Sequence, residues 1–254
     1  TGSDYKQMSY NDGKHSFILD LLVKNPASWT PDEPSLYTLQ LFRVTGDHET
    51  LLRETTCGLR EVAISAQDGL TLNGVPLKLR GGCIHHDNGP LGAASFAAAE
   101  ERKVRLLKAA GYNAVRCAHN PPAPAFLDAC DRLGLLVMDE LCDCWQEGKN
   151  PYDYHMAFER DWRKDLDAMV RRDRNHPSVI IWSTGNEIPE RDGRSQGYAW
   201  SERLADAIRR LDATRPVTNA LNGLIAPAIN GLIAPAIELN NLESNLIKHQ
   251  SDHD

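Results

Sequence analysis

Short apolar runs in this sequence are followed at once by side chains that can transfer protons or form hydrogen bonds. The polar side chains at these four places are His85, His86 and Asp87, then His119 and Asn120, then Asp139 and Glu140, then Asn186 and Glu187. Cleavage of a glycosidic bond needs a carboxylic acid to protonate the leaving oxygen, and an adjacent amide can bind a sugar hydroxyl. Glu187 beside Asn186 offers that pair, so the stretch WSTGNE at 182–187 gives the sharpest indication of chemistry. The structural alternative is that Glu187 only stabilises a helix N-terminus through the helix dipole.

The elements that would position these side chains alternate between strand and helix patterns. The expected strands cover residues 77–84, 114–117, 135–138, 179–182 and 216–218, and the expected helices cover residues 97–110, 123–133, 157–174 and 197–211. Such alternation predicts a parallel sheet, either in an open doubly wound fold or in a closed (β/α)8 barrel. In a barrel, the polar side chains at the strand ends would face the C-terminal mouth, where barrel enzymes place their chemistry. No GxGxxG turn follows the first strand, which argues against a nucleotide-binding protein.

The N-terminal part, residues 1–66, has a different pattern. Apolar and polar residues alternate there as in half-buried β-strands, and prolines and asparagines interrupt them with turns. We expect this part to belong to an immunoglobulin-like β-sandwich, which needs about 100 residues when complete. Residues 67–221 would then form the first five strands of a TIM-barrel domain, with the boundary near Gln67.

The C-terminal part contains a duplication. The stretch NGLIAPAI occurs at 222–229 and again at 230–237. A single tandem copy of this length does not make a repeat architecture. We therefore expect residues 222–254 to be an atypical tail.

The composition excludes several functional classes. The 254 residues include 28 basic and 35 acidic side chains, and the formal net charge of -7 disfavours nucleic acid and anionic membranes as partners. With 41% hydrophobic and 25% charged residues, the chain has the composition of a globular protein. No apolar run reaches the roughly 18 to 20 residues of a membrane span. The six cysteines form no CxxC pair, so we expect buried free thiols in place of disulfides or a metal site.

Six stretches of the chain resemble, in the same order, the signatures of glycoside hydrolase family 2. They are NPASWTPDEPSLYTLQL (25–41), CGLREVAI (57–64), LNGVPLKLRGGCIHHD (72–87), AVRCAHNPP (114–122), LLVMDE (135–140) and RNHPSVIIWSTGNE (174–187). The family contains β-galactosidases, β-glucuronidases and β-mannosidases, built from a jelly-roll domain, an immunoglobulin-like sandwich and a (β/α)8 barrel. The HHDNGPLGAA and DYH stretches look most like bacterial proteins of β-galactosidase type. The resemblance implies a retaining β-galactosidase, with β-glucuronidase, β-mannosidase or a non-catalytic carbohydrate-binding remnant as alternatives.

The resemblance also implies roles for individual side chains. Glu187 matches the general acid/base of the family, and Asn186 matches the residue that contacts the sugar 2-hydroxyl. His85 and His119 match histidines that line the sugar subsite, and Arg116 matches an arginine that would act as a charge partner. The complete set of expected sugar-binding side chains is Asn186, His119, Asn120, His85, Arg116, Glu140 and Trp145.

Two members of this set have an open alternative. Some family members bind magnesium with a carboxylate at the position of Glu140 and a histidine two residues later, but here the second position is Cys142. We therefore expect no metal and no cofactor, and Glu140 would instead act on Glu187 as a nearby like charge. Trp145 could stack on a sugar ring or pack in the core.

A retaining glycosidase also needs a second carboxylate, about 5 to 5.5 Å from the first, as its nucleophile. In the family that glutamate follows the seventh barrel strand, whereas the strand pattern here ends with a fifth, and neither Glu238 nor Glu243 matches it. We therefore expect this chain to carry the acid/base half of such an enzyme, to bind a carbohydrate, and not to hydrolyse it alone. The resemblance allows the intact enzyme to be an oligomer. It does not indicate the cellular compartment of the enzyme.

Overall fold

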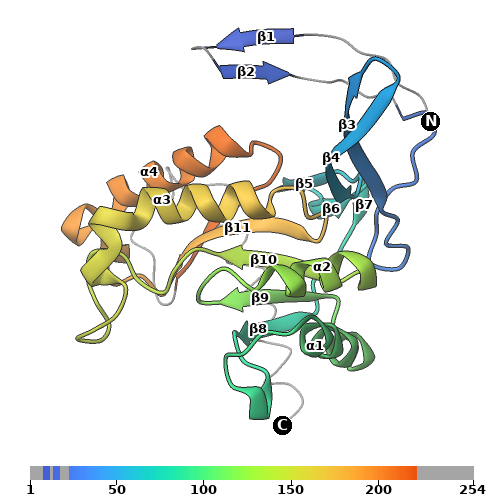
Figure 1. Cartoon of the computed structure of the whole chain (residues 1–254). Helices are drawn as coiled ribbons and strands as arrows, with labels where there is room; N and C mark the ends of the chain where they lie inside the picture. The colour runs from blue at the N-terminus through green and yellow to red at the C-terminus, as the bar shows by residue number, and fades with distance from the viewer. Residues whose placement is uncertain (1–7, 12–13, 18–22, 222–254) are drawn as a thin grey trace.

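The computed structural model describes residues 8–11, 14–17 and 23–221, and its centre is a parallel β-sheet of five strands. The sheet contains β8 (Gly81–His85), β9 (Ala114–Ala118), β10 (Leu136–Glu140), β11 (Val179–Asn186) and β12 (Val217–Ala220). Each strand lies parallel to the one before it in sequence (Figure 1). A doubly wound fold would reverse the strand order at a switch point. The sequential order therefore selects the barrel-type sheet over the open alternative.

Four α-helices connect these strands, and their bounds follow from local sequence signals. They are α1 (Ala97–Ala109), α2 (Pro124–Leu133), α3 (His155–Asp173) and α4 (Gly197–Leu211), accompanied by the short 3-10 helices η1 (Gly89–Leu91), η2 (Pro189–Asp192) and η3 (Arg194–Gln196). Pro124 opens α2 because its missing N–H would have no partner in the first turn. Gly134 ends α2 with a left-handed φ of 73°. A Cβ at Gly134 would also lie 2.1 Å from the Pro31 carbonyl oxygen, so the close approach itself requires glycine.

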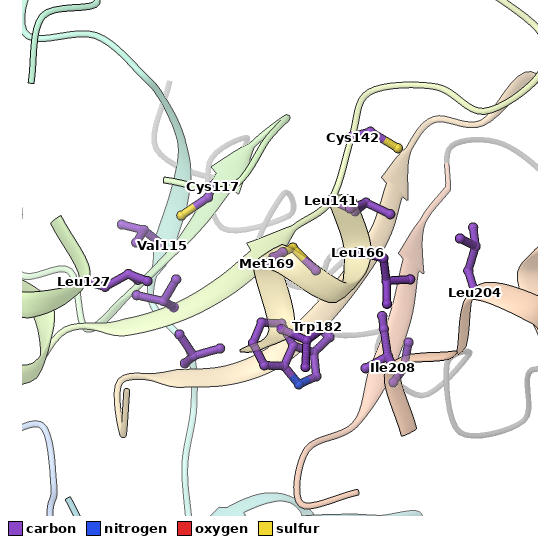
Figure 2. Close-up of a cluster of buried hydrophobic side chains, with 14 of the residues drawn as sticks. Val115, Cys117, Leu127, Leu141, Cys142, Leu166, Met169, Trp182, Leu204 and Ile208 are labelled. Atoms are coloured by element: carbon purple, nitrogen blue, oxygen red, sulfur yellow. The ribbon is translucent and has the colours of Figure 1, made fainter. Parts of the chain in front are cut away.

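One hydrophobic core lies between the sheet and the helices (Figure 2). Alternate strand residues such as Val115 and Val137 supply its sheet side, as the two-residue period of a strand requires. The helix residues labelled in Figure 2 are Leu127, Leu166, Met169, Leu204 and Ile208. Because all four helices contribute to this one core, they cover the same face of the sheet, and strand residues of the opposite parity face away from them.

A second core closes the end of the sheet at which the strands begin. Trp29 is fully buried there, together with Leu136 of β10 and Ile180 of β11. A small antiparallel sheet also packs into this core; its strands are β5 (Val62–Ser65), β6 (Gly69–Leu72) and β7 (Val75–Pro76). The segment that precedes the barrel strands therefore seals their amino ends and leaves their carboxyl ends for the site.

The predicted immunoglobulin-like sandwich is not shown by the structure. The first four strands form two antiparallel hairpins, β1 (Met8–Asn11) with β2 (Lys14–Phe17) and β3 (Tyr37–Thr45) with β4 (His48–Cys57). Hairpin β3–β4 extends away from the barrel sheet in Figure 1. Leu41 and Phe42, which point to opposite faces of this hairpin, are both exposed. The described residues thus provide no facing sheet of the kind that a sandwich requires.

The structure also bears on the expected domain boundary, the tail, the cysteines and membrane-spanning helices. Residue 67 lies in the turn between β5 and β6, inside one small sheet, and the domain boundary near it stays a prediction. The tail at 222–254 lies outside the described residues. All six cysteines are free thiols; four are buried, Cys57 is half-buried and Cys83 is exposed. In the described part of the chain, no helix has the length and apolarity to cross a membrane.

A buried ion pair connects α2 to the start of β11. The His176 ring nitrogen Nδ1 lies 2.6 Å from Asp131 Oδ2, and the exposed side-chain fractions of the two residues are 15% and 4%. Asp131 Oδ1 also accepts a hydrogen bond from the Ser178 backbone N–H. Burial alone would lower the pKa of His176, but the hydrogen bond and charge of Asp131 outweigh it and raise this pKa.

We expect the stabilising effect of His176 to depend on pH. Because its pKa is raised on folding, its contribution is fully present below the unfolded pKa of about 6.5 and is lost as pH rises through the folded pKa. Each unit of increase is equivalent to about 1.4 kcal/mol. Urea unfolding at pH 6 and pH 9 should show that His176→Gln destabilises the chain more at pH 6 than at pH 9, with His48→Gln on the exposed hairpin measured as the control. An equal loss at both pH values would contradict this prediction.

Candidate active site

Several polar side chains lie on the face of the sheet that points away from the helices, which is the inner face of the barrel. Val115 and Cys117 face the helices, so Arg116 between them faces inward, and Glu140 shares the inward parity of Leu136 in β10. Asp139, which we expected at the mouth, has the opposite parity and is fully buried against α3. Burial and the charge of Asp173 in α3 raise the pKa of Asp139 well above its usual range. Asp139 is therefore a structural carboxyl group outside the site.

Glu140 is the centre of a hydrogen-bond network at the carboxyl ends of the strands. Its side chain has an exposed fraction of 0%. Glu140 Oε2 accepts hydrogen bonds from Arg116 Nε at 2.9 Å and from Ser183 Oγ at 2.7 Å, and Arg116 Nη2 also lies 2.8 Å away. Glu140 Oε1 lies 2.7 Å from His119 Nδ1. Protein groups thus engage both oxygens, and through these contacts Glu140 holds Arg116 and His119 in place; its expected contact with the sugar stays a prediction.

Asn186 ends β11, and its side-chain amide is held at both ends. Its Oδ1 accepts a hydrogen bond from Arg116 Nη2 at 2.7 Å, and its Nδ2 donates to Asp143 Oδ1 at 2.8 Å. Its backbone oxygen accepts from Lys149 Nζ at 2.7 Å. An amide nitrogen carries two hydrogens, so the second N–H of this oriented group is the one that could donate to a sugar hydroxyl.

Glu187 follows directly after β11, and its side chain is exposed. Its backbone N–H donates to the Ala220 carbonyl oxygen of β12 at 2.6 Å. The next helical segment, η2, begins only at Pro189 and has Ile188 as its N-cap. Glu187 therefore lies before this short helix and outside its first turn, which argues against the helix-dipole alternative.

Of the other predicted side chains, the structure brings the two histidines together and buries the tryptophan. The rings of His85 and His119 meet edge to face, with centroids 5.4 Å apart. Asn120 is exposed, and its Nδ2 donates to the Pro121 carbonyl oxygen. Trp145 is 2% exposed and stacks on Phe158. Trp145 is thus part of the hydrophobic core, and its stacking on a sugar ring stays a prediction.

A groove opens beside this network. Its volume is about 420 Å³, which falls within the roughly 300–1,000 Å³ typical of ligand pockets. The loops after β9 and β10 supply His119, Asn120 and Asp143 to its lining, and α3 supplies Met169 and Arg172. The groove therefore connects two predicted sugar-binding residues with the carboxylate that binds Asn186.

The sequence patterns missed Asp143, Lys149 and Ser183. Asp143 and Lys149 lie on the irregular segment 141–154, which follows β10 and therefore starts at the same rim. That position after a strand end was the available signal for Asp143. Lys149 is nine residues beyond the strand, and no periodicity or spacing places its ammonium group against Asn186.

The residues at this rim do not fit a magnesium ion. Both Glu140 oxygens are engaged by protein donors, and the buried Cys142 Sγ lies 3.7 Å from the Thr184 carbonyl oxygen. Within residues 8–11, 14–17 and 23–221, no group of three or more His, Cys, Asp or Glu side chains is arranged to hold a metal.

Comparisons with known proteins agree on one family. Residues 62–249 match the model of the glycosyl hydrolases family 2 TIM barrel domain. Beta-galactosidase BoGH2A of Bacteroides ovatus is 45% identical over 193 residues, which cover 76% of this chain and 22% of that protein. A putative beta-glucuronidase of Formosa agariphila is 42% identical over 170 residues, covering 66% of this chain and 16% of that protein.

A solved structure shares the fold as well as the sequence. The glycosyl hydrolase family 2 member from Bacteroides cellulosilyticus superposes with a TM-score of 0.77 at 47% identity, over 83% of this chain and 27% of that one. The chain thus spans between 16% and 22% of the curated relatives it matches. The resemblance seen in the sequence is confirmed for the barrel part.

Proposed function

Because the chain belongs to glycosyl hydrolase family 2, we propose that it forms the part of a retaining β-glycosidase that carries the general acid/base, Glu187. One observation supports this most directly. Glu187 has an exposed side chain and directly follows Asn186, whose side-chain amide is hydrogen-bonded to both Arg116 and Asp143. A proton donor next to an oriented hydrogen-bond donor is what a glycoside needs at its leaving oxygen and at a neighbouring hydroxyl.

In the proposed mechanism, Glu187 acts twice. As the bond between the sugar and its leaving group breaks, the Glu187 carboxyl group gives its proton to the leaving oxygen. The resulting carboxylate then takes a proton from the water that releases the sugar from the enzyme. The nucleophile in the family follows the seventh strand, beyond the five strands that the structure describes.

The substrate we propose is a β-galactoside, in agreement with the name of the relative that is 45% identical. The second candidate is a β-glucuronide, favoured by the name of the relative that is 42% identical. The part of the sugar that approaches His119 and Asn120 would occupy the groove beside them. Nitrophenyl β-galactoside, β-glucuronide and β-mannoside, compared by kcat/KM, would separate these sugars.

We expect the 254-residue polypeptide alone to release no nitrophenol from these substrates above the uncatalysed rate. A retaining reaction needs the second carboxylate about 5 to 5.5 Å from the first, and the proposal places that residue outside the described strands. A chimera in which residues 62–221 replace the matching stretch of a family 2 β-galactosidase should be active. If the 254-residue chain turned over these substrates and Glu187→Gln abolished the activity, the proposal that the nucleophile lies outside this chain would be wrong. An inactive but folded chimera would contradict the proposed function.

A further inference from the structure

The peptide plane that joins Asn186 to Glu187 is held at both of its polar atoms. Its carbonyl oxygen, on Asn186, accepts a hydrogen bond from Lys149 Nζ at 2.7 Å. Its N–H, on Glu187, donates to the Ala220 carbonyl oxygen at 2.6 Å. Because the orientation of this plane sets the direction in which the Glu187 side chain leaves the backbone, both contacts bear on the position of its carboxyl group.

Glu187 needs such support because its backbone conformation is unfavourable. Its φ is +42°, in the left-handed region that a side chain with a Cβ rarely adopts. Such a residue persists where surrounding contacts over-determine its conformation, and such residues cluster at functional sites. Ala220 supplies one of these contacts from the neighbouring strand, and Lys149 supplies the other from a distant loop.

Lys149 is itself held on its loop by acidic groups. Asp143 Oδ1 lies 2.7 Å from Lys149 Nζ, and the exposed side-chain fractions are 22% for Lys149 and 35% for Asp143. Asp153 Oδ2 accepts a hydrogen bond from the Lys149 backbone N–H at 2.8 Å. Glu190 Oε1 accepts from the Glu147 backbone N–H at 2.7 Å, which ties the same loop to η2 just beyond Glu187.

The charge on Asp143 stabilises this arrangement. Partial burial alone would raise the pKa of Asp143, but the hydrogen bonds from Lys149 and Asn186 outweigh it and lower this pKa. The same oxygen, Asp143 Oδ1, accepts hydrogen bonds from the Lys149 ammonium group and from the Asn186 amide. The ammonium group in turn reaches the backbone of Asn186, which closes a ring of three mutual contacts.

We propose that Lys149 is a positioning residue for the acid/base: its ammonium group fixes the peptide plane between Asn186 and Glu187 and so aims the Glu187 carboxyl group. This inference rests on the proposed function for its catalytic meaning. The contact itself can be tested without turnover.

The direct test is hydrogen exchange at the Glu187 amide in the 254-residue chain. Lys149→Met keeps the aliphatic stem and removes the donor, and it should speed exchange at this amide by about tenfold, because the peptide plane loses one of its two anchors. Lys149→Arg should restore slow exchange, since its guanidinium also donates hydrogen bonds. Lys164→Met, an exposed lysine on α3, is the matched control and should change nothing.

The outcomes separate this inference from the proposed function. Unchanged exchange at Glu187 in Lys149→Met overturns the positioning role, and so does faster exchange throughout β9 and α2, which would make Lys149 a general stabiliser. In the active chimera, Lys149→Met should lower kcat by about ten- to hundredfold with KM within about twofold, because a misplaced catalytic group slows the chemical step. If the chimera has no activity with Lys149 in place, the proposed function fails while the exchange experiment still decides the positioning.

Discussion

Glu187→Gln in the active chimera is expected to lower kcat/KM by about 10²- to 10⁴-fold for β-galactosides of alkyl alcohols or sugars. These leaving groups are strong bases and need a proton as the glycosidic bond breaks, and glutamine has no proton of suitable acidity to give. Dinitrophenyl β-galactoside should lose far less at the glycosylation step, because its leaving group departs as an anion. The measurement is the ratio of kcat/KM values for the two classes of substrate, before and after the substitution.

Two further variants make this test specific to Glu187. Glu202→Gln removes an exposed carboxylate on α4 and should leave both classes of substrate unaffected. Glu187→Ala leaves a space that azide can enter, and azide should attack the glycosyl-enzyme and release a β-glycosyl azide, since this second step then needs no general base. Equal losses for alkyl and dinitrophenyl substrates, without rescue by azide, would assign the acid/base to another residue.

The sequence predicted the barrel part well because each of its signals is local. The four helices and five strands follow from periodicity, and the observed α4, Gly197–Leu211, matches the expected range of 197–211. The rule that barrel enzymes use the carboxyl ends of their strands then brought His85, His119 and Asn186 into one set, to which the family resemblance added Arg116. The structure places these four in direct contacts with one another or with Glu140.

What the sequence could not show depends on contacts between distant segments. The direction of each side chain depends on strand parity, which separated Asp139 from Glu140 although the two are adjacent. Trp145 is an aromatic residue at the rim by sequence, but its indole N–H donates to the Thr184 carbonyl oxygen and its ring is in the core. Lys149 reaches Asn186 across 37 residues of sequence through an irregular loop.

The free energy of unfolding should depend strongly on Glu140, more than on any exposed carboxylate of the chain. Glu140→Ala is expected to destabilise the 254-residue chain by about 3–5 kcal/mol, because it leaves the Arg116 guanidinium partly buried without this carboxylate. It also removes the acceptor for Ser183 Oγ and the partner of His119 Nδ1. Urea unfolding measures this loss, and Glu202→Ala, on exposed α4, should stay within about 0.5 kcal/mol of the unaltered chain.

A double-mutant cycle identifies the source of the loss. If the cost comes from the loss of the carboxylate that faces the Arg116 guanidinium, then Arg116→Met should recover a large part of it in the Glu140→Ala background, since an apolar side chain needs no carboxylate there. If the cost came only from the lost volume of the glutamate, Arg116→Met would add its own destabilisation to that of Glu140→Ala. A loss below about 1 kcal/mol for Glu140→Ala alone would contradict the role of Glu140 as the centre of the network. The network would then have to be held by Asp143 and Lys149, from the loop side of Asn186.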